Sequence, residues 1–166
     1  MDLFSALVPV LTQPAGAAAT LRGSEAHEDI RGVVRFYQTA HGVLVVTDVE
    51  GLPSPAAPCA SPVFAFHIHS GGTCTGNEAD PFADAGTHYN PGNCPHPYHA
   101  GDLPPLFGCG GRAFSAVLTD RFTLAEILGK TVILHAKPDD FTTQPAGNAG
   151  EKLACGVIRP LMSQRP

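Results

Sequence analysis

Two histidines separated by one residue, His67 and His69, end a segment of alternating side chains, Val63–His69. In a strand, this alternation puts two phenylalanines and Ile68 on one face and the two histidines on the other. The apolar face predicts contact with a core, which leaves both imidazoles outside it. Two imidazoles on one side of a strand are close enough to bind one metal ion. The segment therefore predicts a metal site on the outside of a sheet.

A second cluster of metal-ligand residues follows: His88, His96, His99 and Asp102. The last three have an H-x-x-H-x-x-D spacing, which is compact enough for a single ion. Three imidazoles and one carboxylate suit zinc in a closed tetrahedral site. If His67 and His69 belong to a second, nitrogen-rich site, copper is favoured there, because divalent affinity peaks at copper.

Other metal folds explain these residues less completely. A cupin site needs a glutamate soon after the H-x-H pair, but the next one, Glu78, comes nine residues after His69. A non-haem iron site, with two histidines and a carboxylate, fits His99 and Asp102 only loosely. A three-histidine zinc site of the carbonic-anhydrase type stays open. None of these alternatives uses all the candidate ligands.

Composition predicts the kind of scaffold that must position these residues. The 166 residues include 18 glycines and 16 prolines, and only 15% are charged, against about 25% in ordinary globular chains. Turn signals recur between short alternating segments, which favours an all-β sandwich or barrel. The 43% of hydrophobic residues and a net charge of −5 argue against disorder, and 10 cations against 15 acids argue against nucleic-acid binding.

The same patterns give approximate element and domain limits. Strands are expected at 31–38, 43–49, 63–69, 112–119, 131–135 and 153–158, a helical turn near 123–128, and irregular loops at 70–105 and 137–150. We expect one domain over residues 18–160, an N-terminal extension of residues 1–17 that is flexible, and a C-terminal tail of residues 161–166.

Apolar runs and cysteines indicate the compartment only indirectly. No apolar run approaches the roughly 18 residues of a membrane span, so we expect no membrane association. Asp2 stands where a signal peptide would carry Lys or Arg, which favours a cytoplasmic location and leaves export open. The five cysteines contain no C-x-x-C pair, and at least one of them must be unpaired.

Seven short blocks together resemble the copper/zinc superoxide dismutase family over about residues 18–158. They are FHIH at 66–69, GTC at 72–74, HYNP at 88–91, HAGD at 99–102, HAKPDD at 135–140, GNAG at 147–150 and LACGVI at 153–158. The blocks occur in the order that the family has. The resemblance implies an eight-stranded Greek-key β-barrel with long metal-binding and electrostatic loops.

The resemblance also implies a role for each residue of the site. It makes His67, His69, His88 and His135 the copper ligands, and His88, His96, His99 and Asp102 the zinc ligands, with His88 shared. It makes Asp139 the carboxylate that links His67 to His96, and it pairs Cys74 with Cys155 in a disulfide. Cys94 and Cys109 match nothing in the family, so a second disulfide and two free thiols are both open, and Cys59 is left over.

The implied reaction converts superoxide to oxygen and hydrogen peroxide by copper redox cycling, supported by zinc and by proton transfer at His88. Superoxide is a small anion and would be the main partner, and a homodimer is the expected assembly. Lys152 occupies the position of the family's guiding arginine, so it would keep the charge but lose the two-pronged donor. The loop at 141–146 is also short. The alternative function is a copper and zinc storage or sensing module with low turnover.

Overall fold

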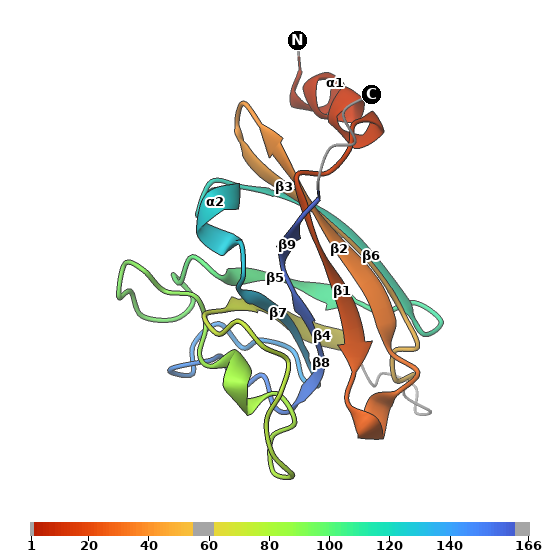
Figure 1. Cartoon of the computed structure of the whole chain (residues 1–166), viewed down its shortest axis with the longest axis vertical. Helices are drawn as coiled ribbons and strands as arrows, with labels where there is room; N and C mark the ends of the chain where they lie inside the picture. The colour runs from red at the N-terminus through yellow and green to blue at the C-terminus, as the bar shows by residue number, and fades with distance from the viewer. Residues whose placement is uncertain (1, 55–61, 162–166) are drawn as a thin grey trace.

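The computed structural model describes residues 2–54 and 62–161 (Figure 1). Eight strands form one antiparallel sheet: β1 (Ala17–Gly23), β2 (Arg31–Thr39), β3 (Gly42–Glu50), β4 (Val63–His69), β5 (Asp102–Phe107), β6 (Arg112–Thr119), β7 (Thr131–His135) and β8 (Lys152–Val157). A two-residue strand, β9 (Arg159–Pro160), pairs with β1.

The strand order across the sheet is β5-β4-β7-β8-β1-β2-β3-β6. The terminal strands of this order, β5 and β6, contact each other, so the sheet curls into a nearly closed barrel. Consecutive strands such as β3 and β4 are not neighbours, whereas β3 pairs with β6 and β4 with β7. These crossovers give the Greek-key arrangement, and the predicted all-β barrel is confirmed.

Alternating side chains fill the barrel. In β4, Phe64, Phe66 and Ile68 point into the main core, where each is at most 4% exposed. In β3, Val43 and Val45 join the same core, while Leu44 and Val46 pack on the outer face. The period-two pattern therefore assigns the two faces of β3 and β4 correctly, because a one-residue shift would reverse every side chain. The strand β1 was not predicted.

The prediction of an irregular segment from 70 to 105 is wrong at its end, because β5 begins at Asp102. Pro104 and Pro105 removed the usual strand signal. Proline is nevertheless tolerated at the edge of a sheet, where its missing N–H faces no partner. The strand β5 lies at one end of the strand order, and its pairing with β4 shifts register between Phe64 and Phe66.

Short helices complete the fold. The expected helical turn is α2 (Leu124–Ile127), whose Glu126 carboxylate accepts hydrogen bonds from the backbone N–H and the hydroxyl of Thr123. In the N-terminal extension, α1 (Leu3–Leu7) runs into the 3-10 helix η1 (Val8–Thr12), and Val10 packs on the outer face of the barrel beside Leu44. No helix in the described residues is long and apolar enough to cross a membrane.

The loop that follows β4 is tied to the barrel at two places. A disulfide joins Cys74 to Cys155 of β8, and Phe82 and Ala85 pack with Ile133 against the same point. The 3-10 helix η3 (Ala83–Ala85) lies in this loop. The expected disulfide is thus confirmed.

Cys94 and Cys109 do not form the second disulfide that the sequence left open. Cys94 and Cys109 are exposed free thiols within the described part of the chain. Cys59 lies outside the described residues.

Replacing both Cys74 and Cys155 with alanine should lower the free energy of unfolding by about 4 to 5 kcal/mol, because the bridge closes a loop with a sequence separation of 81 residues. Denaturant unfolding of the metal-free protein measures the change. The matched control replaces Cys94 and Cys109, which bridge nothing. Equal stability of the two double variants would contradict the role given to the disulfide.

Candidate metal centre

The strand β4 delivers His67 and His69 to the outer side of the barrel wall. Their neighbours in β4 fill the core, so the strand's alternation fixes where both imidazoles point. Both histidines are nevertheless buried, at 0% and 2% exposure. The long loops after β4 and β7 cover them, and the site is therefore closed off between barrel and loops.

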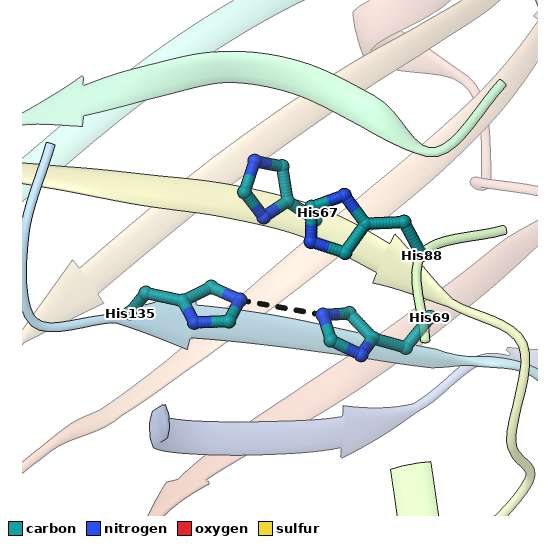
Figure 2. Close-up of side chains that lie close together, drawn as sticks. All are labelled: His67, His69, His88 and His135. Atoms are coloured by element: carbon teal, nitrogen blue, oxygen red, sulfur yellow. Dashed lines mark hydrogen bonds between the residues drawn. The ribbon is translucent and has the colours of Figure 1, made fainter. Parts of the chain in front are cut away.

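Four histidines converge at this point. His135, at the end of β7, lies next to β4 in the sheet, and the isolated bridge between His69 and His88 brings in the loop. One ring nitrogen from each of His67, His69, His88 and His135 lies within 4.8 Å of the others. Figure 2 shows the four rings facing a common space, with His69 Nε2 only 3.3 Å from His135 Nε2.

In His69 and His67, a hydrogen bond made by one ring nitrogen leaves the other nitrogen available to bind a metal ion. His69 Nδ1 donates to the carbonyl of Gly86 at 2.8 Å, and because a carbonyl only accepts, the Nε2 lone pair stays available. His67 Nε2 donates to Asp139 at 2.8 Å, which leaves His67 Nδ1 buried without a partner. Such bonds set the tautomer and the ring orientation that a metal ligand requires.

The second group consists of His88, His96, His99 and Asp102, again with ligand atoms within 4.8 Å of one another. The Asp102 carboxylate lies 2.7 Å from His88 Nδ1 and accepts the His99 backbone N–H at 3.0 Å. It also lies 3.0 Å from His96 Nδ1, yet that nitrogen has no hydrogen bond. A close approach without hydrogen-bond alignment is the arrangement expected of two ligands aimed at one ion.

His88 belongs to both groups. Its Nδ1 faces Asp102 of the second group, while its Nε2 is buried without a hydrogen-bond partner. Together with His67 Nδ1 and His96 Nδ1, it makes three buried ring nitrogens that the described residues do not satisfy. Buried polar atoms without partners are costly, and metal ions would satisfy all three. The donor sets therefore fit two ions with one shared imidazole.

The carboxylate of Asp139 connects the two groups. Its two oxygens accept from His67 Nε2 and His96 Nε2, both at 2.8 Å. Burial acts to raise the pKa of Asp139, but hydrogen bonds from His67, the Phe141 backbone and His96 outweigh it and hold the pKa well below its usual range. The carboxylate is therefore ionised and acts only as an acceptor for both rings.

Burial keeps three histidines of the first group neutral, namely His67, His69 and His135. Desolvation, reinforced by the neighbouring imidazoles, lowers the pKa of His135 to about 3 and brings the pKa of His69 well below its usual value. Desolvation also lowers the pKa of His67. A neutral imidazole is the form that binds metal, so these rings need not lose a proton to do so at neutral pH.

Lys152 lies beside the first group but its charge is matched. It is paired with His135 across β7 and β8, and its Nζ donates to the Asp80 carboxylate at 2.6 Å and to the Phe82 carbonyl at 3.1 Å. The side chain is only 15% exposed. Burial acts to raise the pKa of the Asp80 carboxyl, but hydrogen bonds from Lys152 and from the Phe82 backbone N–H, together with the Lys152 charge, lower it.

The sequence did not predict three residues that stabilise the site: Arg121, Gln144 and Asp80. Arg121 donates from one guanidinium nitrogen to the backbone carbonyls of Pro97, His99 and Asp102, at 3.2 to 3.3 Å. The Gln144 side chain clamps both backbone groups of His96. These residues, like Asp80, act on backbone atoms or on another side chain, and no ligand-type spacing marks them.

The fold and the site define a class: an antiparallel Greek-key barrel that carries two adjoining metal-ligand groups, with one histidine in both. A family model described as "Copper/zinc superoxide dismutase (SODC)" matches residues 30–158. The chain therefore belongs to the copper/zinc superoxide dismutase family, a family of oxidoreductases.

Individual relatives agree with the family match. "Superoxide dismutase [Cu-Zn] 2" of Aquifex aeolicus is 33% identical over 146 residues, covering 79% of this chain and 80% of that protein. The Photobacterium leiognathi "Superoxide dismutase [Cu-Zn]" is 33% identical, covering 77% and 78%. "Superoxide dismutase [Cu-Zn] A" of Xenopus laevis is 34% identical, covering 86% and 95%.

Replacing Asp139 with asparagine should weaken zinc binding by about 10- to 100-fold, because one amide oxygen cannot replace a carboxylate that accepts from two rings. A competition titration with a zinc chelator measures this affinity. The control is Asp140→Asn, which changes the neighbouring carboxylate, whose hydrogen bonds go to Thr142 and Thr143. Equal zinc affinity in the two variants would show that the link is dispensable.

Proposed function

We propose that this chain is a superoxide dismutase that converts two superoxide ions and two protons to oxygen and hydrogen peroxide. Copper would be held by His67, His69, His88 and His135, and zinc by His88, His96, His99 and Asp102. The observation that carries the proposal is that His88 is common to both groups, with one nitrogen facing Asp102 and the other left without a partner.

When bound, copper supplies one-electron redox chemistry, and zinc, which is redox-silent, supplies a fixed positive charge. The protein's own residues then orient ligands and move a proton. Gly86 and Asp139 hold His69 and His67 in a single tautomer. His88 Nε2 is the buried atom at which a proton would be held and passed to the reduced substrate, because His88 Nδ1 faces the second ligand group.

The substrate is an anion, while the chain carries a net charge of −5, so a local positive field has to attract it. Lys152 would supply this field, but Asp80 offsets much of its charge. The same ion pair is the observation that favours the competing function, a copper and zinc storage or sensing module with slow turnover. A homodimer and a cytoplasmic location remain predictions from the sequence.

Replacing His135 with alanine should abolish dismutation and copper binding but leave zinc bound, because His135 belongs only to the first group. Metal analysis of protein reconstituted with both ions, combined with a superoxide assay, measures this. The control is His41→Ala, an exposed histidine outside both groups. Stoichiometric copper in the unaltered protein with no turnover above that of buffer would favour the storage module.

Replacing Asp80 with asparagine should raise kcat/KM for superoxide by about two- to tenfold at low ionic strength, because it releases the charge of Lys152. The gain should shrink as salt is added. Glu78→Gln is the matched control, since it removes one negative charge from the same loop without touching Lys152. An equal gain in both variants would mean that only net charge matters.

A further inference from the structure

The outer face of the barrel wall opposite the metal centre gathers arginines. The strands β1, β2, β3 and β6 lie side by side there (Figure 1). Their outward side chains line a groove of about 320 Å³, and its lining includes Arg22, Arg31, Arg35 and Arg112. Four of the chain's seven arginines are thus on one face of an acidic protein.

The register of the strands puts three of these arginines in one row. Arg22 of β1 is the direct partner of Arg31 of β2, Arg31 is the partner of Glu50 of β3, and Glu50 is the partner of Arg112 of β6. Like charges on directly opposed residues destabilise a sheet. Local features that cost stability are commonly found at functional sites, so the pair Arg22 and Arg31 requires an explanation.

The carboxylates in the groove leave two guanidinium groups unmatched. Glu50 accepts from Arg31 Nε at 2.6 Å and lies 3.6 Å from Arg112, which also reaches Asp48 at 3.4 Å. Arg22 and Arg35 have no ion pair with any residue in the described ranges, 2–54 and 62–161. Both face solvent. The groove therefore carries an excess of two positive charges.

We infer that this groove binds an oxyanion group, a phosphate or a sulfate ester, between Arg22 and Arg35. A guanidinium presents paired N–H donors that match two oxygens of such a group, and it does so better than an ammonium. Thr20, which lies between the two arginines along β1 and β2, adds an exposed hydroxyl to the same wall. A bound anion would also relieve the repulsion between Arg22 and Arg31.

Isothermal titration of the metal-loaded protein with pyrophosphate at low ionic strength tests this site. We expect saturable binding, and at least about tenfold weaker binding in the double variant Arg22→Ala/Arg35→Ala. Lys137→Ala removes one exposed cation outside the groove and should bind as the unaltered protein does. Equal affinity in the unaltered protein and the double variant would place any anion elsewhere and overturn the inference, as would the absence of saturable binding.

A second titration with dextran sulfate separates the two sources of the anion. Tighter binding of the polymer than of pyrophosphate, lost in the same double variant, would assign the groove to the sulfate esters of an extended chain. Tighter binding of pyrophosphate would assign it to a small phosphate compound. Either result supports the oxyanion site, whereas binding of both probes that is indifferent to the double variant contradicts it.

Thermal melting distinguishes a binding role from a structural one. Without ligand, Arg22→Gln should raise the melting temperature by about 1 to 4 °C, because it removes the opposed like charge. Pyrophosphate should raise the melting temperature of the unaltered protein more than that of Arg22→Gln. A lower melting temperature for Arg22→Gln would mean that Arg22 stabilises the sheet, which would overturn the inference.

Discussion

The bidentate carboxylate of Asp139 is the interaction on which the metal centre depends. It accepts one hydrogen bond from His67 on the barrel wall and one from His96 in the loop, and both distances are 2.8 Å. Together with the hydrogen bond from His69 Nδ1 to the Gly86 carbonyl, it ties the loop that carries the second ligand group to the histidines of β4. Because the carboxylate is buried and ionised, its partners are fixed in one tautomer. Asp139 thus couples the two ligand groups, while Arg121 and the Cys74–Cys155 disulfide fasten the loop after β4 to the barrel.

Much of this arrangement could be read from the sequence, because it follows from short-range periodicity. The alternation in β4 fixed the core face and hence the outward direction of His67 and His69. The H-x-x-H-x-x-D spacing brought His96, His99 and Asp102 within reach of one another. By contrast, residue spacing alone left His135 as an ordinary core histidine. His135 lies beside His69 because β4 pairs with β7, and the paired residues are more than sixty positions apart in the sequence. Only the family resemblance predicted this contact.

The features that could not be predicted from the sequence share one physical cause. Pro104 and Pro105 are strand breakers in most settings, and only the edge position of β5 makes them compatible with a sheet. Arg121 and Gln144 stabilise the loop through backbone carbonyls and N–H groups, which every residue possesses and which leave no trace in residue type. The contacts that depend on tertiary position rather than on local pattern are therefore the ones that escaped.

The loop after β4 contributes to the site in three separate ways. Its Gly86 carbonyl sets the tautomer of His69, its Asp80 offsets the charge of Lys152, and its Cys74 fastens it to β8. Since Lys152 is itself on β8, three residues from the disulfide-bonded Cys155, the bridge holds the ion pair as well as the loop. The field that a small anion meets is thus adjustable by substitutions in this loop alone, while the barrel and the buried ligands stay unchanged.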